Sequence, residues 1–208
     1  MATKTDTAPF EPSGLVFDCD GTLVDTMFFY WHSWEVICEK YGIKFDMKRF
    51  FSFAGVPVRD IYQTLIDEQF TDGRPKPDLD QLLEEKHEIV KEDRKVNPPG
   101  PIKCVVDIVK KYHGKIPMAV ASSGKRECVH EDLRRNGLTG YFDAVVTCED
   151  VVNGKPAPDI FLLACKKINV PPEKCRGFED ADLGMVSLNR AGMDAVDVRL
   201  MPDYPHKF

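Results

Sequence analysis

Residues 14–26 read GLVFDCDGTLVDT and begin with a pattern typical of a buried strand. The first four residues, GLVF, have the length of a short strand that is covered on both faces. Asp18 and Asp20 follow directly at the carboxyl end of that strand. In open sheets of parallel strands, ligands bind just beyond the carboxyl ends of the strands. The stretch therefore predicts a core strand that delivers two carboxylates to a binding site.

The second half of the chain alternates between strand and helix patterns. It begins after NPPGP at 97–101, which is the strongest break in the sequence. Short apolar runs predict strands over 117–121, 142–146, 176–178 and 195–198. The segments between them predict helices around 105–109 and over 125–136, 157–168 and 183–191. This alternation is typical of a parallel sheet with helices on both faces, so the predicted fold class is α/β with a Rossmann-like parallel sheet core.

Residues 27–97 interrupt this alternation with helical patterns only. Apolar residues at steps of three and four predict a first helix that stops at Gly42; they are Trp31, Trp34, Cys38 and Tyr41. Further helices are expected from Pro57 onward and over 79–94. We therefore predict a disordered tail over 1–13, a core made of 14–26 and 98–208, and a small inserted helical cap domain over 27–97.

The composition is that of an ordinary globular protein. The chain has 208 residues, of which 43% are hydrophobic and 30% charged, with a net charge of −6. This acidic balance argues against a general nucleic-acid binder or a basic membrane-surface protein. Neither a bilayer span, which needs ~18 apolar residues, nor a signal peptide is visible. Seven cysteines without a CxxC pair indicate free thiols in a reducing compartment, so we expect a cytoplasmic protein.

Polar groups follow four of the predicted strands at the edge where ligands bind. These groups are Asp18, Asp20, Ser122, Lys155, Glu179 and Asp180. Carboxylates suit Mg²⁺, while a hydroxyl and a lysine suit phosphate oxygens. A carboxylate held beside them can attack phosphorus. A carboxyl group two residues further on can protonate the leaving oxygen, and such proton transfer typically accelerates a reaction ~10²–10⁴-fold. The pattern predicts a site for a hard cation and a phosphate.

Each of these groups has a simpler interpretation when it is taken alone. The DCDG sequence could be a plain turn, although a calcium loop is excluded because Thr22 and Leu23 stand where it needs an acidic residue and a glycine. The serine could cap a helix, the lysine could lie on the surface, and the Glu-Asp pair could begin a helix. No GxGxxG or P-loop sequence is present. The order of the groups and their shared edge favour the site.

With these motifs the chain resembles the haloacid dehalogenase-like hydrolases. The sequence DCDGTLVDT at 18–26 matches the DxDGTLxDT motif of that family in full. The further matches are VASS at 120–123, GKPAPD at 154–159 and FEDADLG at 178–184. The resemblance covers nearly the whole chain after residue 13. The helical insert is similar to the small mobile cap of the family.

The resemblance implies phosphoryl transfer through a covalent aspartyl phosphate. It implies that Asp18 is the nucleophile and a metal ligand. It implies that Asp20 is the acid/base and that its main-chain carbonyl also binds the metal. The true dehalogenases of the superfamily lack an aspartate at the second position, so Asp20 implies phosphate chemistry.

The resemblance also implies the rest of the site and its cofactor, Mg²⁺. Ser122 and Lys155 would bind the transferring phosphoryl group. Asp180 would be a metal ligand, and Glu179 would be either a ligand or the partner of one. The site would therefore be assembled from all four motifs.

Within the family, residues 178–199 resemble most a bacterial phosphatase that acts on fructose-1-phosphate and 6-phosphogluconate, in the β-phosphoglucomutase-like subgroup. The sequence EKHE at 85–88 is similar there too, which implies that Lys86 faces the substrate. The alternative for Lys86 is a solvated charge on a helix. Arg59 resembles a phosphate-gripping cap arginine, displaced by one residue from the family's spacing.

One departure separates the chain from the mutases of this subgroup. They carry a histidine in the cap linker where this chain has Tyr30, and His32 lies two residues further on. We therefore expect a monomeric phosphatase of small phosphorylated metabolites, such as fructose-1-phosphate or 6-phosphogluconate, with no nucleic-acid or membrane partner. The alternatives are a β-phosphoglucomutase-type mutase and a catalytically silent binding protein. The cap is expected to open and close about hinges near 26–28 and 97–101.

Overall fold

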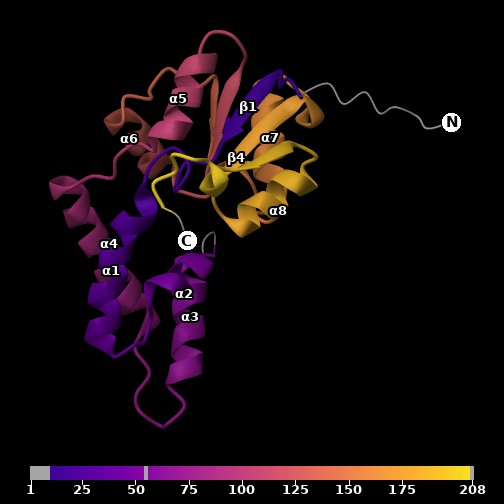
Figure 1. Cartoon of the computed structure of the whole chain (residues 1–208). Coiled ribbons are helices and arrows are strands. Elements are labelled where there is room, and N and C mark those ends of the chain that lie inside the picture. The colour runs from indigo at the N-terminus through magenta and orange to yellow at the C-terminus, as the bar shows by residue number, and fades with distance from the viewer. Residues whose placement is uncertain (1–9, 54–55, 207–208) are drawn as a thin grey trace.

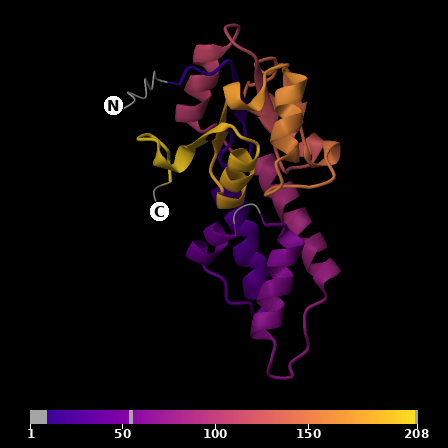
Figure 2. The same cartoon turned by 90° about the vertical axis from the view of Figure 1, so that its right-hand side faces the viewer.

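The computed structural model describes residues 10–53 and 56–206. Figures 1 and 2 show a sheet flanked by helices at one end of the molecule and a group of helices at the other. Within the described part, five parallel strands lie in the order β3-β2-β1-β4-β5. Their bounds are β1 Gly14–Phe17, β2 Met118–Ala121, β3 Ala144–Val146, β4 Cys175–Glu179 and β5 Asp194–Asp197. The predicted α/β fold with a parallel sheet is confirmed.

Strand β1 lies at the centre of the sheet and is buried on both faces. Successive side chains of a strand point to opposite faces, so an apolar strand needs cover on both sides. Leu15 and Phe17 pack against α5 and α6, while Val16 packs against α7 and α8. These four helices are α5 Lys103–Tyr112, α6 Arg126–Arg135, α7 Asp159–Lys167 and α8 Asp182–Arg190. The motif that follows β1 therefore starts from a fully buried strand at the centre of the sheet.

The helical unit comprises α1 Thr26–Tyr41, α2 Met47–Ser52, α3 Val58–Gln69 and α4 Leu79–Val96. Its own apolar core contains Trp34, Tyr62, Leu65 and Leu82, which are almost fully buried. The rings of Trp34 and Tyr62 lie 4.2 Å apart. Helix α1 ends at Gly42, whose φ of +64° is the left-handed conformation that favours glycine at a helix end.

Two neighbouring chain segments connect the helical unit to the sheet unit, which consists of the five strands and the helices α5 to α8. Val24 pairs with Pro101 in an antiparallel bridge. The Asp25 N–H donates to the Gly100 carbonyl at 2.8 Å, and the Ile102 N–H donates to the Leu23 carbonyl at 2.9 Å. These bonds fix both segments at the sheet side. If the units bend relative to each other, as the sequence predicts, we expect the bend to lie beyond these bonds, toward α1 and the end of α4.

Some element boundaries differ from the sequence prediction. Strand β3 begins at Ala144 instead of residue 142, because Asp143 bonds to Met118 through both its N–H and its carboxylate, each at 2.8 Å. Of the predicted tail, residues 1–9 lie outside the described residues, and the Ser13 N–H donates to the Lys174 carbonyl at 2.8 Å. Among the described helices, none combines the length and the apolar character needed to cross a membrane.

Candidate active site

The strand-end groups predicted from the sequence gather at the carboxyl edge of the sheet. Asp18 follows β1 and Ser122 follows β2, while Lys155 lies in the loop between β3 and α7. Glu179 ends β4 and Asp180 follows it. Asp18, Ser122, Glu179 and Asp180 are all buried. Parallel strands bring these ends to one edge, so residues far apart in the chain meet there.

Three carboxylates form the centre of the cluster. One oxygen each from Asp18, Glu179 and Asp180 lie within 4.8 Å of one another. Burial, followed by the charge of Glu179, raises the pKa of Asp18 and of Asp180. The Thr22 hydroxyl donates to Asp180 at 3.0 Å. Oxygen ligands at this density, with mutual repulsion, fit a divalent cation.

Lys155 supplies the positive charge that the protein itself places in this cluster. Its ammonium donates to Asp18 at 2.5 Å and to Glu179 at 2.7 Å. The lysine side chain is only 4% exposed. Burial would lower the pKa of Lys155, but the charges of Asp18 and Glu179 outweigh it and raise that pKa. The ammonium is therefore held in its charged form between two carboxylates.

Two glycines allow the carboxylates to approach the backbone. Gly21 has a φ of +80°, and a Cβ at this position would overlap the Asp180 carboxylate. A Cβ on Gly184, in the first turn of α8, would overlap the Glu179 carboxylate. The Glu179 side chain turns back to accept from the Ala181 N–H at 3.0 Å. Glycine at these two positions thus leaves room for the Asp180 and Glu179 carboxylates.

Asp20 lies beside this cluster and faces a cavity of about 1380 Å³ between the two units. The Ser122 hydroxyl donates to the Asp20 carboxylate at 3.3 Å and accepts from the Gly124 N–H at 3.0 Å. Lys155 also lines this cavity. A substrate in the cavity would therefore meet Asp20 and the lysine together.

The helical unit contributes Lys86 to the same cavity. The Lys86 side chain is buried, and its ammonium donates to the Ser33 hydroxyl at 2.7 Å. The ammonium also lies 4.9 Å from the centre of the Trp34 ring and 5.6 Å from that of Tyr30. No carboxylate of the described residues forms an ion pair with it. Burial lowers the pKa of Lys86 to about 8. The alternative of a solvated helix charge is therefore wrong.

The other residues predicted on the helical unit lie differently. Arg59 is exposed and forms an ion pair with Asp80 at the start of α4. Tyr30 lines the cavity, whereas His32 is turned outward and bonds to Asp93 at 2.8 Å. The structure therefore brings Lys86 and Tyr30 to the cavity with Asp20, and it does not bring Arg59 there.

Sequence reasoning missed a partly buried ion pair that joins the two units. Arg94, in the last turn of α4, donates two hydrogen bonds to Asp132 of α6. It also donates to the Tyr30 hydroxyl at 2.8 Å. Bidentate pairs of this kind fix orientation as well as distance. An arginine near a helix end and an aspartate inside another helix gave no sequence signal that they would meet.

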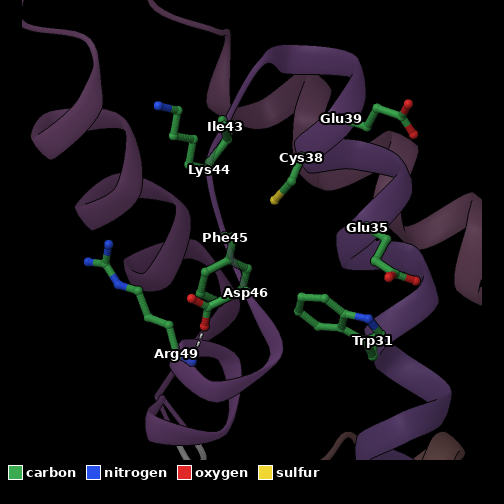
Figure 3. Close-up of a pocket in the computed structure, with 9 residues that line it drawn as sticks. All are labelled: Trp31, Glu35, Cys38, Glu39, Ile43, Lys44, Phe45, Asp46 and Arg49. Carbon is green, nitrogen blue, oxygen red and sulfur yellow. Dashed lines mark hydrogen bonds between the residues drawn. The ribbon is translucent and has the colours of Figure 1, made fainter.

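A second pocket of about 690 Å³ lies wholly within the helical unit. Figure 3 shows Trp31 and Cys38 on one side of this pocket, with Phe45 and Arg49 across from them. The Asp46 carboxylate caps α2 by accepting from the Arg49 N–H at 2.7 Å. None of the strand-end groups lines this pocket, so the cavity between the units is the better candidate for the active site.

Two phosphatases of known name are similar to this chain in sequence. The fructose-1-phosphate phosphatase YqaB of Escherichia coli is 39% identical over 189 residues, which are 91% of this chain and 97% of that protein. The phosphorylated carbohydrates phosphatase of Thermotoga maritima is 32% identical over 88% of this chain and 82% of its own length.

A solved structure shares the fold, and a family model identifies the family. The crystal structure of β-phosphoglucomutase from Clostridium difficile has a TM-score of 0.72 at 24% identity, covering 89% of this chain and 83% of that one, which shows a shared fold. The model of the haloacid dehalogenase-like hydrolase family matches residues 15–198. The chain therefore belongs to the haloacid dehalogenase-like hydrolases.

Proposed function

We propose that this protein is a Mg²⁺-dependent phosphatase of small sugar phosphates that acts through a phosphorylated Asp18. The observation that carries the proposal is the position of Lys155 between Asp18 and Glu179. Asp180 lies beside these two carboxylates, and Lys155 itself lines the large cavity. A buried carboxylate next to a fixed cation can receive a phosphoryl group whose charge that cation balances.

In the proposed reaction, an Asp18 oxygen attacks phosphorus and the bond from phosphorus to the leaving oxygen breaks. Asp20 donates a proton to that oxygen and later accepts one from the water that hydrolyses the aspartyl phosphate. Ser122 and Lys155 hold the phosphoryl oxygens. The products are the free alcohol and inorganic phosphate, and Asp18 returns to its carboxylate form.

The three clustered carboxylates would hold Mg²⁺, together with the Asp20 main-chain carbonyl. Asp18 and Asp180 are the proposed direct ligands, and Glu179 is either a third ligand or the partner of one. The metal would supply positive charge to the transferring phosphoryl group. Burial, followed by the charge of Glu179, raises the pKa of Asp180, and a cation beside these carboxylates would offset both effects.

The helical unit is the proposed cap, and Lys86 is its proposed contact with the far end of the substrate. Lys86 lines the cavity, and no described carboxylate pairs with its ammonium. The names of the two phosphatase relatives, one for fructose-1-phosphate and one for phosphorylated carbohydrates, support a sugar phosphate as substrate. We place the protein in the cytoplasm as a monomer, which size-exclusion chromatography with light scattering would check.

The decisive experiment is phosphate release from a panel of sugar phosphates, including fructose-1-phosphate and 6-phosphogluconate. Each compound is tested with Mg²⁺, with EDTA, and with Asp18→Asn. We expect release that needs Mg²⁺ and is lost in the variant. Release that survives in Asp18→Asn would overturn the proposal.

The second candidate is a phosphosugar mutase, because the fold is shared with a β-phosphoglucomutase. Conversion of β-glucose-1-phosphate to glucose-6-phosphate without net phosphate release would favour it. A protein that binds sugar phosphates but turns over none would instead be a silent binding protein.

A further inference from the structure

The last described residues of the chain run back to the junction of the two units, where Figure 1 shows the yellow segment beside the start of α1. Tyr204 is 4% exposed, and its ring belongs to the apolar cluster that covers β1. Its hydroxyl donates to the Gly21 carbonyl at 2.7 Å. Tyr204 and Gly21 are separated by 183 positions in the sequence, so only the folded chain brings them together.

We propose that Tyr204 is a positioning residue for the Asp18–Thr22 loop, and that the C-terminal segment 201–206 braces this loop and the base of the helical unit together. The proposal rests on the function proposed above for Asp18 and Asp20. It assigns a role in catalysis to a segment that lies outside all four sequence motifs.

The hydrogen bonds of the loop explain why an outside donor matters. The Cys19 carbonyl accepts from the N–H groups of Thr22, Leu23 and Val24, and the Gly21 N–H donates to the Val24 carbonyl. These bonds close the turn but leave the Gly21 carbonyl for the Tyr204 hydroxyl. A buried carbonyl needs such a partner, because a buried acceptor that loses its hydrogen bond keeps the full cost of its desolvation.

The peptide that Tyr204 holds is in direct contact with the carboxylate cluster. Gly21 packs against the Asp180 carboxylate, and the Thr22 hydroxyl donates to the same carboxylate at 3.0 Å. Rotation of the peptide between these two residues would therefore move Asp180 relative to Asp18. Burial raises the pKa of Tyr204, so its hydroxyl keeps the proton that it donates.

The same segment makes a second contact four residues further along the motif. The His206 ring nitrogen lies 2.8 Å from the Asp25 carboxylate. The His206 ring also packs on Phe28 of α1, with 4.2 Å between the ring centres. Asp25 is the residue whose N–H bonds to Gly100 in the other connecting segment. The C-terminal segment 201–206 thus contacts both the Asp18–Thr22 loop and the start of α1.

The test is Tyr204→Phe, which keeps the ring and removes one hydroxyl. The control is Tyr141→Phe, because Tyr141 packs against the same apolar cluster away from the loop. We expect kcat of Tyr204→Phe to fall about tenfold while KM changes less than twofold, since the lost bond acts on the reacting groups. Mg²⁺ binding measured by calorimetry without substrate should also weaken severalfold. The control should retain wild-type kcat and Mg²⁺ affinity.

A second variant, His206→Gln, should lower kcat two- to threefold, and its KM should again change less than twofold. It keeps the proposal testable if Tyr204→Phe fails to fold. A lower melting temperature with wild-type kcat and Mg²⁺ affinity in both variants would overturn the proposal, because it would leave the segment a structural role only. If wild-type protein releases no phosphate, the proposed function fails, whereas the calorimetric comparison still tests Tyr204.

Discussion

The sheet unit and the helical unit each bury a lysine beside the same cavity, in opposite surroundings. Lys155 lies between Asp18 and Glu179, and their charges raise its pKa above the ordinary value despite its burial. Lys86 has a hydroxyl and two aromatic rings as neighbours, and burial lowers its pKa to about 8. The charge of Lys155 is thus balanced by carboxylates of its own unit, whereas the charge of Lys86 is left for a ligand to balance.

Replacement of the balanced lysine should have the largest effect. Lys155→Met would leave three clustered carboxylates without their cation, and removal of one partner of a buried ion pair typically costs about 3–5 kcal/mol. We expect phosphate release to fall at least about 10³-fold and the free energy of unfolding in EDTA to fall by about 3 kcal/mol, as measured by urea titration. Mg²⁺ should restore part of this stability.

The matched control is Lys125→Met, because Lys125 is an exposed lysine that lines the same cavity. It should keep the stability of the wild type. Equal stability of Lys155→Met and wild type in EDTA would contradict the view that Lys155 holds the cluster together.

Replacement of the unbalanced lysine should give the opposite sign for stability. Lys86→Met removes a buried charge that no described carboxylate pairs with, so the free energy of unfolding should rise by about 1 kcal/mol. For sugar phosphates with a second anionic group, such as 6-phosphogluconate, KM should rise ten- to a hundredfold while kcat stays within a few fold. A neutral sugar phosphate serves as the comparison substrate. A loss of stability in Lys86→Met would show that the two lysines do not differ as described.

The pH dependence should separate the two lysines as well. Lys86 is charged below about pH 8 and neutral above it. Its attraction for an anionic group is therefore present at low pH, and kcat/KM for 6-phosphogluconate should fall several-fold as the pH rises through 8. The effect of Lys86 on the free energy of unfolding has the opposite sign. Between pH 8 and the ordinary lysine pKa of 10.5, this residue binds more protons in the unfolded chain than in the folded one. The free energy of unfolding should therefore increase as the pH rises through this range. Both trends should be absent in Lys86→Met, and an unchanged kcat/KM profile in that variant would rule Lys86 out as their source.

The smallest effect concerns a second buried polar group of the helical unit. The Tyr62 side chain is fully buried, and its hydroxyl has no hydrogen-bond partner among the described residues. Tyr62→Phe should therefore stabilise the protein by about 1 kcal/mol without changing kcat, as thermal unfolding and the phosphate assay would measure. A destabilised variant would mean that this hydroxyl has a partner, such as a water molecule.

The fold could be predicted from the sequence because the alternation of short apolar strands with helices admits few arrangements. The gathering of Asp18, Ser122, Lys155 and Asp180 could also be predicted, since parallel strands present their carboxyl ends at one edge. The roles of these residues stay predictions until the variants are measured.

The contacts between helices could not be predicted in this way. The pairing of Arg94 with Asp132, the burial of Lys86 and the bond from Tyr204 to Gly21 depend on how separate elements pack. Hydrophobic periodicity predicts which face of a helix is buried, but not which polar group of another element it meets. These contacts join parts of the chain that share no motif.

Val24 and Pro101 lie side by side where the chain leaves the sheet unit and returns to it. A segment whose two ends meet in this way can be lengthened, exchanged or rebuilt at little cost to the strands it interrupts. The part of the enzyme that we propose selects the substrate could therefore diverge during evolution while the groups proposed for the chemistry stayed in place. Chimeras could therefore join this sheet unit to the helical insert of a relative, with the joints at these two residues, and so exchange the substrate-selecting part alone.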